Sequence, residues 1–143
     1  MQTVQQALRA AQFYTDGVDY HLISLPRAGI MAAAGVVAEI GEPFCALIVD
    51  KDEVSLVIPA EAVEHFSNRF KDALLGDYPY RLITLDIVLD SDLIGFMATL
   101  THALEEAQVP VIAIGAYSRD HLLIPVQHID VALSTLKQLQ FGI

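Results

Sequence analysis

The stretch that decides the fold covers residues 112–136 and reads IAIGAYSRDHLLIPVQHIDVALSTL. The apolar run over 109–116 predicts a strand, Arg119-Asp120 marks a turn, and 121–126 predicts a second strand that folds back on the first. After Pro125 the apolar residues recur at three- and four-residue steps, which is the period of a helix: Ile129, Leu133, Leu136 and Leu139. The stretch is therefore predicted to form a β-hairpin followed by an amphipathic helix.

The same pattern occurs earlier in the chain. The segment 20–25, YHLISL, resembles 80–85, YRLITL, and the segment 56–59, LVIP, resembles 122–125, LLIP. The two pairs are offset by 60 and 66 positions, since Tyr20 corresponds to Tyr80 and Pro59 to Pro125, and they occur in the same order. This identical order favours a duplication over a chance match.

The second half has a strand and a helix before the hairpin. Residues 81–87 alternate between apolar and polar positions, as a strand does. From 92 to 107 the period changes to that of a helix, with an apolar stripe of Leu93, Met97, Leu100, Leu104 and Ala107. Asp90 or Ser91 is expected to cap this helix, and Pro110 to stop it.

The first half repeats this order of elements. Strands are expected at 20–25, 44–49 and 53–58, and helices at 28–40 and 60–70, after an extra helix at about 3–11. The turn at 76–79, Gly-Asp-Tyr-Pro, is the boundary, giving a first repeat within 1–76 and a second within 77–143. We therefore expect an α+β fold of two ferredoxin-like βαββα repeats, each a two-layer sandwich with an antiparallel sheet.

Composition excludes several classes of partner. The formal net charge of −10 repels phosphate backbones and anionic lipids, so neither nucleic acid nor a membrane is expected. The single cysteine, Cys45, and the absence of a signal peptide or a bilayer-spanning run favour a cytoplasmic location. The apolar share of 54% predicts that part of the surface is buried in a homodimer or higher homo-oligomer.

Four blocks of the sequence resemble tandem ACT-domain proteins, a class of small regulatory modules that bind amino acids. The blocks are DGVDYHLISLP at 16–26, DEVSLVIPAEAVE at 52–64, YRLITL at 80–85 and the stretch 112–136, so the resemblance covers roughly 17–139. The last block is similar to the ending of small bacterial tandem ACT proteins and related arginine sensors. The resemblance implies a regulatory protein without cofactor that binds an amino acid at an ACT–ACT interface.

The sequence departs from the ACT pattern in two places. An ACT unit has a fourth strand after its second helix, but only Phe141-Gly142-Ile143 follow the last helix here. The strand at 80–87 would have to be the fourth strand of one half or the first of the other, or the halves would exchange strands. The family's ligand loop has a glycine at the helix start, whereas Gly95 is expected inside the first turn, which argues against classical serine or phenylalanine sensing.

The resemblance also indicates a ligand site. It consists of the loop residues Asp90, Ser91, Asp92, Leu93 and Gly95, facing the strand end Ile114, Gly115, Ala116 and Tyr117. Free N–H groups of a helix N-terminus accept a carboxylate, glycines let a ligand approach the backbone, and a carboxylate holds an ammonium. The same residues have a purely structural interpretation as helix caps and a β-bulge.

The charges of the predicted ligand loop indicate which class of ligand it can bind. Asp90 and Asp92 oppose a bound carboxylate and favour a cationic group, so a basic amino acid or a polyamine is easier to bind than an acidic one. The matching loop of the first half, 26–29, carries Arg27 instead, which is expected either to receive a carboxylate or to lie in solvent.

Catalysis and metal binding are not expected. Ser118, Asp120 and His121 contain the residue types of a catalytic triad, but Asp120 and His121 are neighbours on a strand and point to opposite faces. The five histidines lack metal-ligand spacing. The alternative to an amino-acid sensor is a structural or adaptor protein that docks a partner through its apolar sheet face, and a small enzyme is a third hypothesis.

Overall fold

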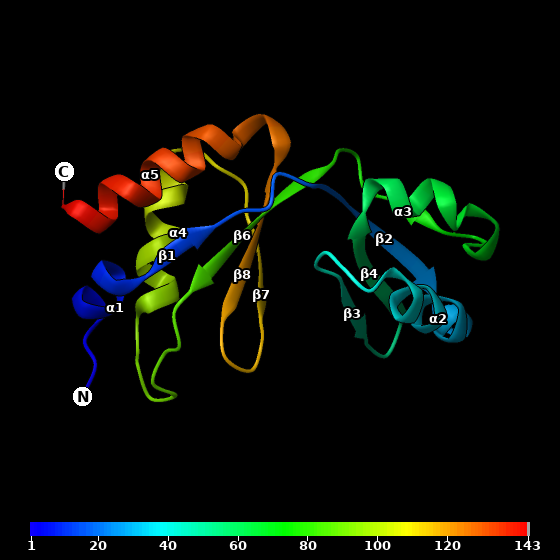
Figure 1. Ribbon diagram of the computed structural model, residues 1–143, viewed down its shortest axis with the longest axis horizontal. Coiled ribbons are helices and arrows are strands. Elements are labelled where there is room, and N and C mark those ends of the chain that lie inside the picture. The colour runs from blue at the N-terminus through cyan, green and yellow to red at the C-terminus, as the bar shows by residue number, and fades with distance from the viewer. Residues whose placement is uncertain (143) are drawn as a thin grey trace. The chain divides into compact units, whose positions relative to one another are not determined.

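The computed structural model describes residues 1–142 and divides the chain into two compact units (Figure 1). Unit 2 is continuous, from Val18 to Tyr80. Unit 1 combines Met1–Gly17 with the chain from Arg81 onward. Both units are mixed α+β structures, so the predicted fold class is confirmed.

Unit 2 is a complete ferredoxin-like domain. Its elements are β2 (Asp19–Pro26), α2 (Ile30–Ile40), β3 (Ala46–Val49), β4 (Glu53–Pro59), α3 (Ala60–His65) and β5 (Leu74–Leu75), with single 3-10 turns at Arg27–Gly29 and Ser67–Arg69. The strands lie in the order β5-β2-β4-β3, and each adjacent pair is antiparallel. The two-residue strand β5 supplies the fourth strand of this unit.

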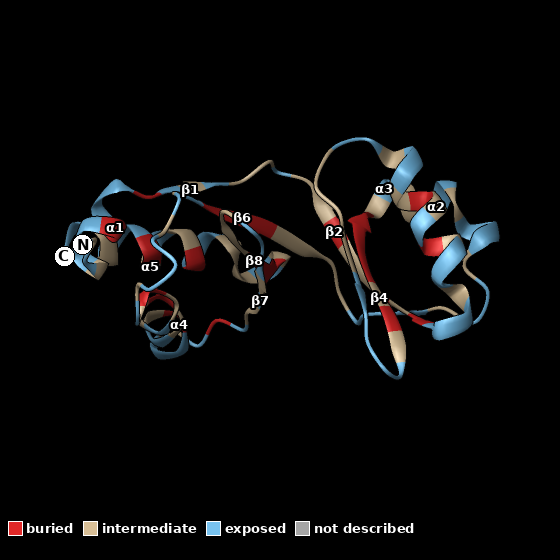
Figure 2. Ribbon diagram, turned by 90° about the horizontal axis from the view of Figure 1, so that it is seen from below, coloured by how far each residue is buried: buried red, intermediate tan, exposed pale blue. Residues whose placement is uncertain are grey.

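Alternation along the strands separates the two faces of the sheet of unit 2. On β2, Ile23 and Leu25 are buried in the core that also includes Ala33 and Val36 of α2. Ser24 lies between them and therefore faces away from the helices. Figure 2 shows the buried residues of β2 and β4 along the strands and those of α2 on one side of the helix.

Unit 1 has the same arrangement, built from two separate segments. The N-terminal segment forms α1 (Val4–Ala10) and β1 (Gln12–Tyr14), and the later segment forms β6 (Tyr80–Asp86), α4 (Phe96–Glu106), β7 (Ile112–Gly115), β8 (Asp120–Pro125), a 3-10 turn (Val126–His128) and α5 (Ile129–Phe141). The strands lie in the order β1-β6-β8-β7. The strand at 80–87 is thus the first strand of unit 1, and β1 is its fourth.

The expected boundaries of 1–76 and 77–143 differ from this division at the N-terminus. Residues 1–17 belong with the second repeat, because Gln12 pairs with Asp86 and Tyr14 with Thr84 in an antiparallel ladder. The side chain of Gln140 donates hydrogen bonds to the carbonyls of Leu8 (2.8 Å) and Ala11 (2.6 Å), which fixes the end of α1 to α5. Ile143 of the expected second repeat lies outside the described residues.

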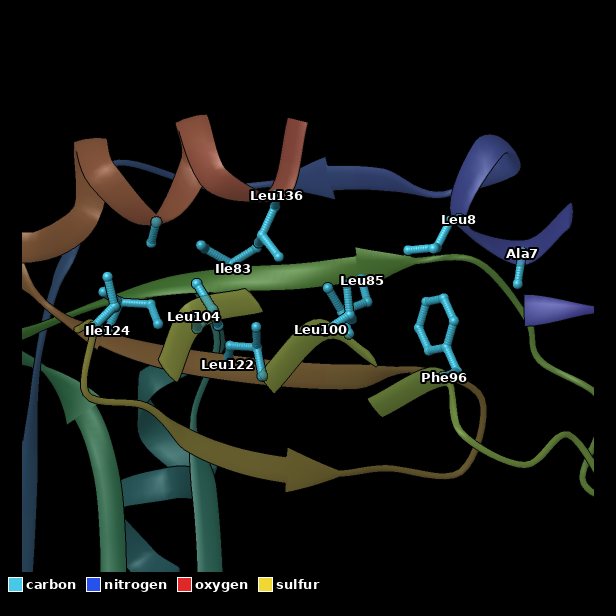
Figure 3. Packing of buried hydrophobic residues seen from close by; sticks show 12 residues of the cluster. Ala7, Leu8, Ile83, Leu85, Phe96, Leu100, Leu104, Leu122, Ile124 and Leu136 are labelled. Carbon is cyan, nitrogen blue, oxygen red and sulfur yellow. The ribbon is translucent and has the colours of Figure 1, made fainter. Parts of the chain in front are cut away.

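The core of unit 1 joins all its helices to one face of its sheet. Figure 3 shows Leu8 of α1 and Phe96 of α4 near Leu85 of β6, with Leu136 of α5 above the same sheet. Leu8, Leu85 and Leu136 have no exposed surface. Each buried leucine of this kind contributes about 2 kcal/mol of transfer free energy, so the N-terminal helix is an integral part of this domain.

Helix α4 begins later than the sequence predicts. The expected helix covers 92–107, but the structure begins it at Phe96 because Gly95 at the N-cap has a left-handed backbone, with φ +93°. Neither Asp90 nor Ser91 caps the helix, and Gly95 stands immediately before it rather than inside its first turn. Leu93 still packs against the core, although from the loop before the helix. Because Leu93 continues the apolar stripe of the helix, the helix predicted from the sequence begins too early, at residue 92.

Candidate functional site

Two loops of unit 1 enclose a hollow of about 280 Å³. One wall is formed by residues 89–91, which lie between β6 and α4, and the other by residues 116–120, the turn between β7 and β8. The amide of Ala116 donates a 3.0 Å hydrogen bond to the carbonyl of Arg119, which closes this turn. The hollow is lined mainly by polar groups that come from segments about 27 residues apart in the sequence.

The loop at 89–91 is fixed by the N-terminus of the chain. The backbone amide of Asp90 donates to Gln2 Oε1 at 3.0 Å, and Asp90 Oδ2 accepts a hydrogen bond from the amide of Gln2 at 3.2 Å. The amide of Leu93 donates to the carbonyl of Asp90 at 3.0 Å, which makes a tight turn. Among residues 1–142, the other carboxylate oxygen of Asp90, Oδ1, accepts no hydrogen bond.

The structure brings four of the nine predicted site residues to this hollow. They are Asp90 and Ser91 from the loop, and Ala116 and Tyr117 from the strand end. Tyr117 is fully exposed, so its ring lies at the rim of the hollow and not in its interior.

The other five predicted residues do not line the hollow. Asp92 is exposed beyond it, Leu93 packs on the core, and the space beside Gly95 faces Val4 of α1 at 3.9 Å. Ile114 and Gly115 are ladder residues of β7, paired with His121 and Asp120. The start of α4 is also absent from the lining, so the expected role of its free amides in holding a carboxylate has no support in the geometry.

Three residues that the sequence interpretation left outside the site do line the hollow. They are Ser118 and Arg119 of the turn directly after the predicted strand end, and Asp120, the first residue of β8. Arg119 Nε donates to Asp86 Oδ1 at 2.7 Å, and the two side chains are each more than 40% exposed. The continuity of this turn with Tyr117 is the sequence signal that could have identified these residues.

Below the hollow, a polar pair crosses the helix-free face of the sheet. Thr84 Oγ1 lies 2.9 Å from His121 Nδ1, joining β6 to β8. Burial lowers the pKa of His121, and Arg119 adds to this effect while Asp120 opposes it. His121 does not line the hollow, although its neighbour Asp120 does. Successive side chains of a strand point to opposite faces, so His121 and Asp120 diverge along β8.

The matching loop of unit 2 carries Arg27, which was expected either to receive a carboxylate or to lie in solvent, and which is exposed. Arg27 donates a 2.6 Å hydrogen bond to the carbonyl of Asp50 and so holds the β3–β4 turn. Its neighbours Pro26, Ala28 and Gly29 line a separate hollow of about 310 Å³ that also includes Arg69 and Lys71. Arg69 is ion-paired with Glu39.

Residues 1–142 contain no group of three or more His, Cys, Asp or Glu side chains placed to hold a metal ion. Within the same part of the chain, no helix combines the length and the apolar character needed to cross a membrane.

Several solved structures share the fold of this chain. The fold is similar to that of a Vibrio cholerae protein of unknown function described as a possible transport protein, with a TM-score of 0.74, 20% identity and coverage of 96% of both chains. It is also similar to a protein from Agrobacterium tumefaciens (TM-score 0.72, 14% identity, 91% of this chain and 89% of that one). The ligand-free regulatory subunit of aspartate kinase from Thermus thermophilus matches with a TM-score of 0.58, 20% identity, and 91% and 98% coverage.

The family model that matches the sequence is that of the ACT domain, over residues 76–138. This segment therefore forms an ACT domain, and the whole chain has the fold of a tandem ACT-domain protein. The match includes β6 to α5 but not β1, in keeping with the contribution of that strand from the N-terminal segment. A search of curated proteins found no match.

Proposed function

We propose that this protein is a non-catalytic regulatory protein that binds a basic amino acid in the hollow of unit 1. The observation that carries the proposal is the convergence of the charged residues Asp90, Arg119 and Asp120 around one small polar space. An amino acid offers both charges, so a site with carboxylates and one exchangeable guanidinium matches its chemistry.

The proposed contacts follow from charge. Oδ1 of Asp90 and the carboxylate of Asp120 are the groups that would hold the ammonium or a cationic side chain, with Ser91 and Ser118 as neutral hydrogen-bonding partners. Arg119 is paired with Asp86 in an exposed ion pair, which is worth only about 0–1 kcal/mol. It can therefore turn toward a ligand carboxylate at little cost.

Ligand binding would act on the rest of the protein through the N-terminal segment, which is hydrogen-bonded to the loop at 89–91. The loop at Asp90 is hydrogen-bonded to Gln2. A ligand that binds the carboxylate of Asp90 would therefore favour one conformation of the N-terminal segment over another. The same proposal includes a cytoplasmic protein that forms a homodimer or a higher homo-oligomer. It is supported by the apolar exposed surface of α2, where Met31 is 80% exposed and Glu39 is the only charged residue of the helix.

Thermal-shift measurements on the full chain test the site. We expect L-arginine or L-lysine at millimolar concentration to raise the melting temperature and L-glutamate not to do so, because a ligand of the native state stabilises it by RT ln(1 + [L]/Kd). Asp90→Asn keeps the acceptor for Gln2 but removes the charge and should abolish the shift, as should Asp120→Asn.

The matched control is Asp92→Asn, which removes one charge from the same loop at a position outside the hollow. It should leave the shift unchanged. Loss of the shift in Asp92→Asn but not in Asp90→Asn would return the site to the helix start, and the absence of a shift with any of the twenty amino acids would contradict ligand binding. The alternative, a structural or adaptor protein that docks a partner through its apolar sheet face, would then be the better description.

A further inference from the structure

The two units place the same row of positions on the helix-free faces of their sheets. In unit 1 the row across β1, β6, β8 and β7 is Tyr14, Thr84, His121 and Ile114. In unit 2 the row across β5, β2, β4 and β3 is Leu74, Ser24, Ser55 and Ile48. The offsets of 60 and 66 found in the sequence relate Ser24 to Thr84 and Ser55 to His121. The repeat therefore extends to the register of the strands.

The charges next to these rows differ between the units. In unit 1 the neighbouring positions hold Asp86 and Arg119, which pair with each other at 2.7 Å. In unit 2 the corresponding positions are Pro26 and Glu53, which are partners in the β2–β4 register. Glu53 thus has a proline where its counterpart has an ion-pair partner.

Glu53 is a half-buried carboxylate with a single side-chain partner. Its Oε1 accepts a 2.5 Å hydrogen bond from Ser24 Oγ. Arg27, the nearest guanidinium by sequence, donates to the carbonyl of Asp50, and Lys51 pairs with Asp52 at 2.7 Å. Among the described residues Glu53 forms no ion pair. A partly buried carboxylate without a counterion is energetically unfavourable.

This carboxylate lies at a second hollow of about 280 Å³, made only of residues from unit 2. Ser24, Ser55 and Glu53 supply its polar groups, and Leu22, Leu74 and Leu75 its apolar wall. Leu74 is 72% exposed and Leu75 is 49% exposed, which leaves a large apolar surface open to solvent beside the negative charge. None of the residues lining the hollow is Lys, Arg or His.

We infer that this hollow is a second binding site, for a primary ammonium that carries a short aliphatic chain. The ammonium would donate to Glu53 and to Ser55, and the chain would cover Leu74 and Leu22. Charge complementarity selects the cation, because the lining contains one carboxylate and no basic group, and the leucines select an apolar substituent over a second charge. The site is independent of the hollow in unit 1, since the two share no residue.

The test is a titration of the ¹⁵N-labelled full chain with n-butylammonium chloride, followed by amide chemical shifts. We expect saturable shifts at residues 24, 53–55 and 74–76, and none of that pattern with sodium butyrate or n-butanol at equal concentration. Glu53→Gln should weaken the binding about tenfold, as expected for the loss of a charge-assisted hydrogen bond. Asp52→Asn, the adjacent exposed carboxylate, should change it less than twofold.

Leu74→Ala provides a second variant that leaves all charges in place, and it should also weaken binding because it removes the exposed apolar wall. Absence of saturable shifts at these residues would overturn the inference, as would equal shifts with n-butanol or unchanged binding in Glu53→Gln. Shifts at 89–91 and 116–120 report on the hollow of unit 1 separately, so failure at one site is distinguishable from failure at the other.

Discussion

Gln2 and Asp90, 88 positions apart in the sequence, exchange two hydrogen bonds between their backbone amides and side chains. The N-terminus of the chain thereby holds one wall of the hollow in unit 1. Gln2→Ala should raise the hydrogen-exchange rate of the Asp90 amide, because its acceptor is lost. The amide of Leu93 donates to a backbone carbonyl and should be less affected. Equal exchange of Asp90 in both proteins would show that this contact does not hold the loop in solution.

Leu8 tests whether the N-terminal helix belongs to unit 1. It is fully buried in the core of that unit, so Leu8→Ala should reduce the free energy of unfolding by about 2–5 kcal/mol. Urea denaturation measures the loss. Leu74→Ala, the same change at a 72% exposed position, should cost much less. If the two variants lost equal stability, the packing of α1 on β6 would be wrong.

Gly95 and Gly35 are expected to respond in opposite directions to the same substitution. Gly95 has φ +93°, which an alanine adopts only with strain, so Gly95→Ala should destabilise the protein by about 1 kcal/mol or more. Gly35 lies inside α2 and a Cβ there would meet only Arg69 at 4.0 Å, so Gly35→Ala should stabilise by about 0.5–1 kcal/mol. Thermal unfolding of both variants measures the two signs. A stabilised Gly95→Ala protein would contradict the observed start of α4.

His121 should make the stability depend on pH. Burial holds its folded-state pKa below the ordinary 6.5, so the unfolded chain binds the proton more tightly. The contribution of His121 is therefore fully present above pH 6.5 and is lost as the pH falls through 6.5 and then through the lower folded-state pKa. His121→Gln should remove this part of the loss between pH 7 and 5, measured by urea denaturation.

An imidazole titration followed by NMR provides the direct measurement for the same residue. A midpoint at or above 6.5 for His121 would contradict the structure. The control is His102→Gln on the exposed side of α4, where the histidine pairs only with Glu106, and it should keep the part of the pH dependence that His121 causes.

The ion pair of Asp86 and Arg119 should contribute little to stability. Both side chains are more than 40% exposed, so a double-mutant cycle with Asp86→Asn and Arg119→Gln should give a coupling energy of about 0–1 kcal/mol that falls at high salt. A salt-independent coupling well above 1 kcal/mol would mean that the pair is covered in solution.

Much of the fold could be predicted because the repeat is visible in its most buried strands. Residues 20–25 and 80–85 match since both lie in the centre of a sheet, where one face must be apolar. The fourth strands could not be predicted in this way. Gln12–Tyr14 and Leu74–Leu75 have only three and two residues, too few for any period, and their pairing depends on partners far away in the sequence.

The site was predicted in part, and one residue accounts for most of the error. Leu93 continues the apolar stripe of α4, so the helix was extended to include it, which placed Gly95 inside the first turn and the helix amides beside Asp90. The left-handed conformation of Gly95 instead makes it the N-cap, and the helix begins after it, at Phe96. Asp90, Ser91, Ala116 and Tyr117 nevertheless line one hollow, because the predicted ends of these strands, at 87 and 116, each differ by only one residue from the ends of β6 and β7.

The topology of unit 1 also sets the sequence of events during synthesis on the ribosome. Unit 2 is continuous, so a nascent chain can fold it as soon as residues 18–80 have emerged. Residues 1–17 emerge before unit 2 but have no partner strand until β6 is made, and their buried side chains stay uncovered until α5 follows. The domain that holds the hollow of Asp90 and Asp120 therefore closes after unit 2, and its helix α1 stays unpacked until α5 has been made.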